Sequence, residues 1–225
     1  MAADRVFIDL HCHTAASFDS LASPASVVRA AASRGLTHLA ITDHGTIDGA
    51  LRGRDAAPAG LTVLVGEEIR TTEGDLIAVF LDRAIPKGLP AGEAIAAIRA
   101  QGGLVGVPHP FDRFRGSVGR GEALTALSRD VDWIEAWNAR ILVGDGNVRA
   151  AELAASLGVP GVAVSDAHTT VEVGVASTVL HGDPSTPAGL LAALAGERDL
   201  RTGRASFYAR LATPAAKLVT WARSR

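Results

Sequence analysis

Short apolar runs alternate with alanine-rich stretches along most of this chain, and that alternation limits the folds it can adopt. The apolar runs have the length of buried strands, and the stretches between them carry helix signals. Strands are expected at 6–10, 38–41, 61–65, 76–81, 104–107, 133–136, 162–164 and 175–180. Strands that alternate with helices build parallel sheets or barrels covered by helices. We therefore expect an α/β protein.

Helix signals lie between the expected strands. Ser23 followed by Pro24 is typical of an N-cap and a first helical position, and Gly35 is typical of a helix end. Further helices are expected at 47–57, 92–101, 147–157 and 187–194. A length of 225 residues suits one α/β barrel. We expect a single domain over residues 1–225, with core motifs in 6–180 and a tail, 198–225, that includes a short amphipathic helix packed on the barrel.

The composition excludes several classes of partner. Hydrophobic residues make up 48% and charged residues 20%, which is typical of a globular protein. A net charge of -2 gives no overall attraction to long nucleic acids or to an anionic membrane, so an anion must be bound locally. No stretch approaches a membrane span, and the single cysteine, Cys12, fits a reducing compartment. We expect a cytoplasmic protein; its oligomeric state is left open.

Histidines and carboxylates gather just after the expected strands. In parallel α/β folds these strand ends form the active-site face. The first strand ends in Asp-Leu-His-Cys-His, which puts His11 and His13 on the same face of an extended chain. Two such imidazoles can bind one cation, although two structural histidines would give the same pattern. Cys12, between them, should face the core.

The next strands are followed by carboxylates and another histidine. Asp19 lies in a Ser-Phe-Asp-Ser turn, which on its own is typical of a solvated loop. Asp43 and His44 end the second strand and suit an orienting acid and a ligand, or a helix cap. Glu67 and Glu68 follow the third strand. Because adjacent side chains alternate faces, only one glutamate should point inward, where it could bridge two cations, and the other should be at the surface or in a salt bridge.

Two later strands end in the same way. His109 lies between two prolines that restrict its loop, in Val-Pro-His-Pro. Asp166 and His168 lie on one face of Ser-Asp-Ala-His. Each segment alone has a structural explanation. The recurrence of ligand-type residues at successive strand ends favours a shared metal centre.

Together these motifs resemble the PHP family, the polymerase and histidinol phosphatase domain family, whose small stand-alone members are described as metal-dependent phosphoesterases. The matching segments, in family order between residues 9 and 168, are DLHCHT with SFDS, AITDH, GEEI, PHP and SDAH. The resemblance implies a distorted seven-stranded (βα)7 TIM-like barrel. It also implies a centre of two or three divalent cations.

The resemblance further implies which residues hold each cation. The first set is His11, His13, Glu68 and Asp166. Glu68 would bridge to a second cation that His109 also binds, and the third set is Asp19, His44 and His168. One position departs from the family, because Asp75 stands where many members have histidine. Aspartate could bind a second cation and favour Mn or Mg over Zn, or leave that site weak, so Mn, Fe, Zn and Mg all stay candidates.

The implied activity is hydrolysis of a phosphate ester by metal-activated hydroxide. Clustered cations lower the pKa of a bound water, to about 7 at a good zinc site, and offset the charge of the phosphoryl oxygens. His168, Asp43 or a water molecule is expected to protonate the departing alcohol. The expected substrate is a small phosphorylated metabolite, a nucleotide or the end of a short oligonucleotide.

Substrate contacts are expected from two segments outside the ligand motifs. Arg113 and Arg115, in HPFDRFRG, could clamp the phosphate or be ordinary loop arginines. Asn138 and Arg140, in IEAWNAR, resemble a family segment near the substrate. Glu135, in the strand before them, would orient a ligand or pair with an arginine.

Two other functions are considered. An amidohydrolase acting on C–N or carboxyl ester bonds shares the His-x-His motif, but many such enzymes bridge their metals with a modified lysine at a strand end. The only lysines here are Lys87, in an expected loop, and Lys217, in the tail. A non-catalytic metal-binding module is the third possibility, although such domains typically lose ligands and this chain keeps nearly all of them.

Overall fold

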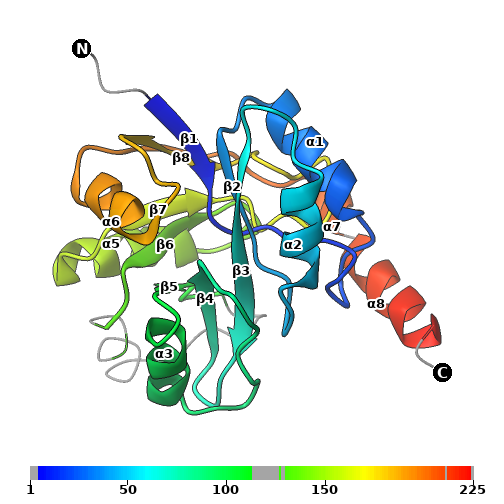
Figure 1. The fold of residues 1–225 in the computed structure, drawn as a ribbon, viewed down its shortest axis with the longest axis horizontal. Coiled ribbons are helices and arrows are strands. Elements are labelled where there is room, and N and C mark those ends of the chain that lie inside the picture. The colour runs from blue at the N-terminus through cyan, green and yellow to red at the C-terminus, as the bar shows by residue number, and fades with distance from the viewer. Residues whose placement is uncertain (1–4, 113–126, 128–129, 211, 224–225) are drawn as a thin grey trace.

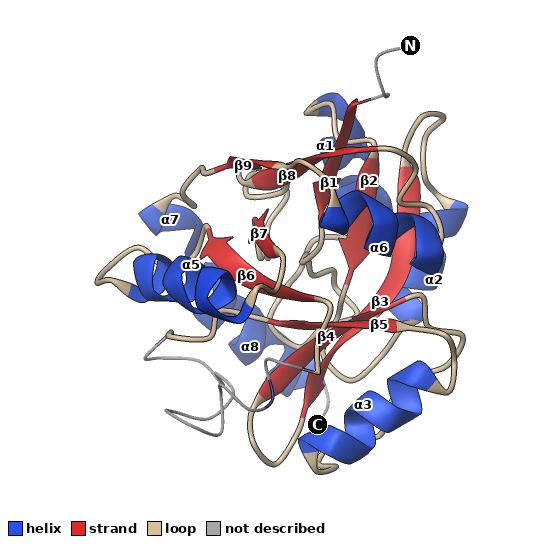
Figure 2. Ribbon diagram, turned by 90° about the vertical axis from the view of Figure 1, so that its left-hand side faces the viewer, coloured by secondary structure: helices blue, strands red, loops and turns tan. Residues whose placement is uncertain are grey.

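The computed structural model describes residues 5–112, 127, 130–210 and 212–223, and its strands form one sheet surrounded by helices (Figure 1, Figure 2). The strands are β1 (Arg5–Asp9), β2 (His38–Ile41), β3 (Thr62–Arg70), β4 (Asp75–Val79), β5 (Leu104–Val107), β6 (Trp133–Asn138), β7 (Gly161–Val164), β8 (Ser177–His181) and β9 (Asp199–Arg201). The helices are α1 (Pro24–Ser33), α2 (Asp48–Asp55), α3 (Ala91–Arg99), α5 (Gly146–Leu157), α6 (Pro187–Ala195), α7 (Phe207–Arg210) and α8 (Ala212–Arg223). The expected α/β class is confirmed.

The order of the strands corrects the expected strand count. Among the described residues the sheet has nine strands in the order β7-β6-β5-β4-β3-β2-β1-β8-β9. β1, β2 and β3 are parallel neighbours, as are β5, β6 and β7. β4 runs antiparallel to β3 and β5, and β8 runs antiparallel to β1 and β9. The four residues 71–74 between β3 and β4 are too few for a crossover helix, so this connection is a hairpin.

The sheet curls until its two halves meet at β7 and just beyond the end of that strand. The Thr178 hydroxyl of β8 accepts a hydrogen bond from the backbone N–H of Ala163 in β7 at 2.9 Å and donates to its carbonyl at 3.1 Å. Beyond the strand ends, Cys12 and Ala167 form an isolated parallel bridge. We call this junction of β7 with β1 and β8 the seam. It makes the sheet a nearly closed barrel.

Large apolar side chains fill the inside of the barrel. One buried cluster joins residues from strands all around the sheet, among them Ile8, Leu64, Trp133 and Leu180. Trp133 is fully buried and lies against Gly106, where an added Cβ would meet the indole at 2.1 Å. Glycine at this position therefore makes room for the largest side chain in the core.

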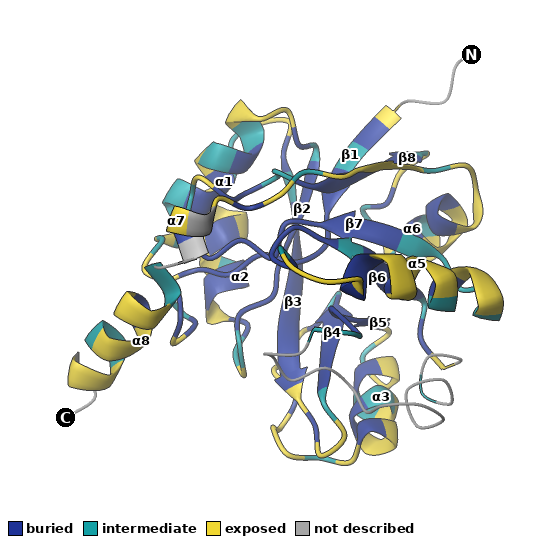
Figure 3. Ribbon diagram, turned by 180° about the vertical axis from the view of Figure 1, so that it is seen from behind, coloured by how far each residue is buried: buried dark blue, intermediate teal, exposed yellow. Residues whose placement is uncertain are grey.

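The helices pack outside the sheet, and the chain end adds a partly attached helix. Apart from β9, whose three residues are exposed, the strands are almost entirely buried, whereas Ala216 is the only buried residue among those described in α8 (Figure 3). The expected helix near the chain end is confirmed as α8, which buries Ala216 but exposes Leu218 and Trp221. The preceding segment is tied to the barrel by hydrogen bonds from Trp137 Nε1 to the Gly203 carbonyl and from Ala205 N–H to the Ala139 carbonyl. No helix of the described chain has both the length and the apolar character needed to cross a membrane.

Candidate metal centre

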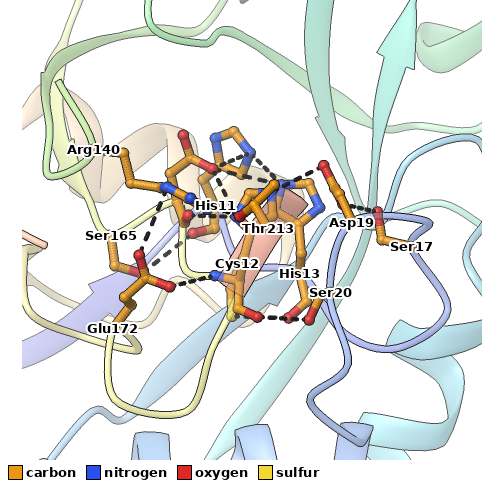
Figure 4. A network of polar contacts seen from close by, with 12 residues as sticks. His11, Cys12, His13, Ser17, Asp19, Ser20, Arg140, Ser165, Glu172 and Thr213 are labelled. Atoms are coloured by element: carbon orange, nitrogen blue, oxygen red, sulfur yellow. Dashed lines mark hydrogen bonds and ion pairs between the residues drawn. The ribbon is translucent and has the colours of Figure 1, made fainter. Parts of the chain in front are cut away.

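The seam brings the ends of β1 and β7 together at one mouth of the barrel. Asp166 N–H donates to the His11 carbonyl at 2.9 Å, and His13 N–H donates to the Ala167 carbonyl at 2.8 Å. This pairing aligns His11 and His13 with Asp166, whose Oδ1 lies 3.7 Å from the Nε2 atom of each histidine. Figure 4 shows the two histidines next to each other, with Asp19 beside them.

Glu68 lies at the centre of the cluster. Its Oε2 atom is 3.2 Å from both His11 Nε2 and His13 Nε2 and 3.4 Å from His44 Nδ1. Its Oε1 atom is 3.3 Å from His109 Nε2. One carboxylate therefore faces four imidazoles, with its two oxygens directed to different sides.

The donor atoms fall into three overlapping groups that fit cations. Within each group the ligand atoms all lie within 4.8 Å of one another. The groups are His11, His13 and Asp166; Glu68, Asp75 and His109; and His13, Asp19, His44 and His168. All are imidazole nitrogens or carboxylate oxygens, and all the residues except the intermediate His44 are buried. This donor set suits Zn, Mn or Fe, so the residues fit the divalent cations that the sequence implies.

The electrostatics of the cluster agree with such a site. Burial would lower the pKa of His11, but the charges of Glu135 and Glu68 outweigh it and raise that pKa to about 10. Burial and the neighbouring His168 lower the pKa of His13. Although burial opposes it, His44 and His11 hold the pKa of Glu68 well below its usual range. In the metal-free cluster a protonated histidine thus offsets carboxylate charge, and a cation would replace that proton.

Glu135 contacts the candidate ligands His11 and His109 and orients them. Its Oε1 lies 2.6 Å from His11 Nδ1, which leaves Nε2 facing the cluster. Its Oε2 accepts hydrogen bonds from His109 N–H and Asn138 Nδ2, both at 2.8 Å. Asn138 also donates to Asp166 Oδ2 at 3.0 Å. The structure thus places Asn138, predicted to bind substrate, against two acids of the centre, while its role toward substrate stays a prediction.

Two of the candidate ligand residues adopt backbone conformations that are rare outside glycine. His109 has φ 28° and Asp166 has φ 52°. Residues other than glycine reach the left-handed region at an energetic cost, and such strain gathers at functional sites. At both positions the conformation directs the side chain into the cluster.

Of three further predicted residues, two lie beside the centre and one lines its cavity. Asp43 accepts hydrogen bonds from Thr14 N–H at 2.6 Å and Thr14 Oγ1 at 2.7 Å, which ties the end of β2 to the segment after β1. Burial raises the pKa of Asp43 to about 6. Arg140 is buried and contacts Thr213 at 2.8 Å and Glu172 at 3.7 Å. The third, His168, does line the cavity, and its Nε2 lies 3.1 Å from Asp19 Oδ2.

Three further predictions concern Arg113, Arg115 and Glu67. Arg113 and Arg115 lie outside the described residues. Glu67, expected at the surface or in a salt bridge, is fully buried and accepts the N–H of Ile85 at 2.7 Å, so that prediction was wrong. Glu67 is buried because β3 continues through Arg70 and both faces of the strand are covered at this position. Cys12 is buried in the apolar core, as predicted.

The cavity over the ligands includes residues that the sequence did not single out. It measures about 390 Å³, and besides seven of the candidate ligands it is lined by Phe18, Arg70 and Lys217. Arg70 forms an ion pair with Asp75, with Nη2 3.0 Å from Oδ2, in addition to a closer contact of its Nε with Oδ1. Arg70 lies two positions after Glu68 in one strand, and this spacing, which puts both on one face, could have identified it.

Comparisons with known proteins agree with this geometry. Residues 9–136, more than half of the chain, match the family model described as PHP domain, and residues 144–198 match the one described as PHP-associated. An uncharacterized protein of Methanocaldococcus jannaschii is 37% identical over 142 residues, which cover 58% of this chain and 81% of that protein. A 5'-3' exoribonuclease of Haemophilus influenzae is 32% identical over 117 residues, covering 46% of this chain and 42% of that protein.

Solved structures share the fold. A two-domain protein from Bacteroides vulgatus, described as containing a predicted PHP-like metal-dependent phosphoesterase, superposes with a TM-score of 0.74 at 19% identity. The superposition covers 89% of this chain and 66% of that one. At this identity the likeness concerns the fold alone, whereas the family match rests on the sequence of residues 9–136. The chain belongs to the PHP domain family.

Proposed function

We propose that this protein is a metal-dependent phosphoesterase that hydrolyses a small phosphorylated metabolite, a nucleotide or the end of a short oligonucleotide. The observation that carries the proposal is the position of Glu68, whose two oxygens face four imidazoles from three different chain segments in a buried pocket. The proposed ligands of two or three divalent cations are His11, His13, Asp19, His44, Glu68, Asp75, His109, Asp166 and His168.

Bound cations would supply Lewis acidity, which polarises a phosphoryl group and lowers the pKa of a water molecule. The side chains around the cations would set the orientation of the phosphoryl group and of the water molecule. Glu135 keeps the His11 ring oriented through the 2.6 Å contact with Nδ1. Asp43 fixes Thr14 and so the course of the chain that carries His13. We assign Asp43 this positioning role in place of proton transfer.

Proton transfer to the departing alcohol is assigned to His168. Its Nδ1 lies 2.9 Å from the Asp166 carbonyl, an acceptor, so Nδ1 carries a proton. When no cation occupies the group of His13, Asp19, His44 and His168, the imidazolium form also carries a proton on Nε2, beside Asp19 Oδ2 at 3.1 Å and at the cavity wall. That atom is positioned to release a proton toward a ligand in the cavity.

Cationic side chains at the cavity favour an anionic substrate. Arg70 and Lys217 line it, and the near-neutral net charge of -2 makes local capture of the anion necessary. The Arg70 guanidinium can bind phosphoryl oxygens in a bidentate manner. We retain Arg113, Arg115, Asn138 and Arg140 as proposed substrate contacts of lower rank.

The number of cations depends on Asp75. Burial and the charge of Glu68 raise its pKa to about 7, and Arg70 is its ion-pair partner. A carboxylate already paired with a guanidinium is a weaker ligand than a free one. We therefore propose two tightly held cations and a weaker one at the group of Glu68, Asp75 and His109.

The names of the relatives support a phosphorus–oxygen bond as the target. The Haemophilus influenzae relative is an exoribonuclease, and the Bacteroides vulgatus structure is described as phosphoesterase-like. An amidohydrolase from Chromobacterium violaceum has the same fold, with a TM-score of 0.58 at 16% identity. However, Glu68 occupies the central bridging position, while Lys87 lies in a loop and Lys217 lies in α8. Phosphate ester hydrolysis is the function that this donor set favours.

The test combines metal analysis with a substrate panel. Protein loaded with Mn, Fe or Zn should contain at least two equivalents of metal and release phosphate from monoesters or nucleotides. Glu68→Gln should lose metal and activity, whereas the exposed Glu152→Gln on α5 should keep both. A metal-loaded protein that hydrolyses amides or carboxyl esters but no phosphate ester would favour the amidohydrolase, and one that hydrolyses neither would favour a binding module.

A further inference from the structure

A second cavity adjoins the one over the metal ligands. It measures about 640 Å³, within the range of ligand sites, and is lined by Phe18, His44, Gly45, Glu68, Arg70, Ala84, Ile85, Pro86 and Lys87. Phe18, His44, Glu68 and Arg70 line both cavities. A ligand whose phosphate lies over the metal ligands would therefore have its remaining atoms within reach of the second cavity.

The walls of the second cavity are largely apolar. Phe18 is 48% exposed, which is unusual for such a side chain, and its ring stacks on His44 with centroids 5.0 Å apart. Across the cavity the segment 84–87 contributes Ile85 and Pro86. An aromatic ring held between the exposed side chains of Phe18 and Pro86 would remove apolar surface of both from water.

Hydrogen bonds hold the segment 84–87 in place without a ligand. Ile85 N–H donates to Glu67 Oε2 at 2.7 Å, and Gly88 N–H donates to the Arg70 carbonyl at 2.7 Å. Both partners lie on β3, which also carries Glu68. The cavity wall is therefore fixed to the strand that supplies the central metal ligand, and a ligand would meet a preformed surface.

The charges around the two cavities indicate an anionic ligand. Lys87 and Lys217 are the only lysines of the chain, and each lines one of the cavities. Arg70 lines both. Both lysines of the chain thus lie at the candidate site. They give it a local attraction for a phosphate ester that the near-neutral overall charge does not provide.

Other cavities of the described chain fit less well. One of about 480 Å³, which contains Leu21, shares only His168 with the cavity over the ligands. Another of about 580 Å³, beside β9, shares no lining residue with it. Neither is lined by a phenylalanine, tyrosine or tryptophan.

We propose that the second cavity is a leaving-group subsite for a flat aromatic ring, such as a nucleobase, on a phosphate ester whose phosphoryl group lies over the metal ligands. The inference rests on the proposed phosphoesterase function and narrows its substrate class. Phe18 and Pro86 contact the ring, and Arg70 contacts the phosphate.

The test compares AMP with ribose 5-phosphate, which differ by the base alone. In the metal-loaded protein kcat/KM should be about tenfold higher for AMP, since one base packed on an aromatic side chain adds about 1–3 kcal/mol. Phe18→Leu, which keeps an apolar side chain and loses the ring, should bring the ratio close to one. Leu21→Ala is the matched control, because Leu21 is 49% exposed in the same loop but lines the other cavity, so the ratio should stay unchanged.

A second measurement separates this proposal from the proposed function. In saturation-transfer NMR with the magnesium-loaded protein, the base protons of AMP should receive saturation, and Phe18→Leu should abolish it. The subsite would be overturned by equal kcat/KM values for the two esters or by absence of saturation at the base protons. It would also be overturned if Leu21→Ala, instead of Phe18→Leu, removed the preference for AMP. Absence of turnover of every phosphate ester, with base saturation intact, would overturn the phosphoesterase and leave the subsite standing.

Discussion

Glu67 gives the prediction whose magnitude follows most directly from the structure. Its side chain is fully buried, one oxygen accepts the Ile85 N–H at 2.7 Å, and Oε1 has no hydrogen-bond partner in the described chain. Burial raises the pKa of Glu67 from 4.5 to about 7. Because the folded-state pKa is the higher one, the folded protein binds the proton more tightly than the unfolded chain. The stabilisation from this proton is complete below pH 4.5 and is lost as the pH rises through about 7.

Glu67→Gln should remove this pH dependence. The pKa difference of about 2.5, at about 1.36 kcal/mol per unit, corresponds to an upper bound of about 3 kcal/mol. The glutamine carbonyl can still accept the Ile85 N–H, so the variant and the parent should be equally stable near pH 4.5. Above pH 8 the variant should be the more stable protein by about 2–3 kcal/mol.

Urea unfolding of the metal-free protein between pH 4.5 and 9 measures the difference. Metal-free protein is required because metal binding adds its own pH dependence. Glu93→Gln, on the exposed side of α3, is the control and should give a small difference that does not change with pH. The reasoning is refuted if Glu67→Gln is destabilising at every pH, or if its effect is the same at pH 5 and pH 9.

Three further predictions follow from single contacts. Glu135→Gln weakens the hold on the His11 ring and should lower metal affinity by about 10–100-fold, measured by competition with a chelator. Asp75→His introduces a nitrogen ligand and removes the ion pair with Arg70, so the metal content should rise and shift toward Zn. An unchanged metal content would argue against a second metal site at residue 75. Gly49→Ala should cost at least about 2 kcal/mol in urea unfolding, because the added Cβ would meet a buried carboxylate oxygen at 1.9 Å, whereas Gly92→Ala, with open space around it, should be neutral or stabilising.

The strand positions were predictable from apolar runs, but the direction of the strands was not. Local apolar patterning identifies a buried strand and carries no information on whether its neighbour is parallel. β4 lies within an expected strand, yet it runs antiparallel to both neighbours. The short connection at 71–74 was a usable signal, since it leaves room only for a hairpin. The end of β3 was set too early because Glu67 and Glu68 were expected to follow the strand instead of continuing it.

The candidate site was predictable where its residues follow strands, because strand ends converge in a barrel regardless of details. The residues that line the cavity from elsewhere were harder to find. Phe18 lies in the motif that supplied Asp19, but nothing in the sequence indicates that its ring stacks on His44. Lys217 reaches the cavity from α8, far along the chain. Contacts of this kind depend on how the tail packs, and one sequence does not encode that in any local pattern.

The metal centre and the closure of the barrel depend on the same contacts. The mouth of the seam is held by backbone hydrogen bonds between the His11–His13 segment and the Asp166–Ala167 segment, and by Ser165 N–H donating to Asp9 Oδ1 at 3.0 Å. The ligands therefore approach one another only when the seam is closed. In turn, the buried carboxylates and imidazoles would destabilise a closed seam unless opposite charge compensates them, since each unpaired buried ion costs several kcal/mol. A cation shared by the ends of β1, β3 and β7 would supply that compensation, so metal binding and seam closure should stabilise each other.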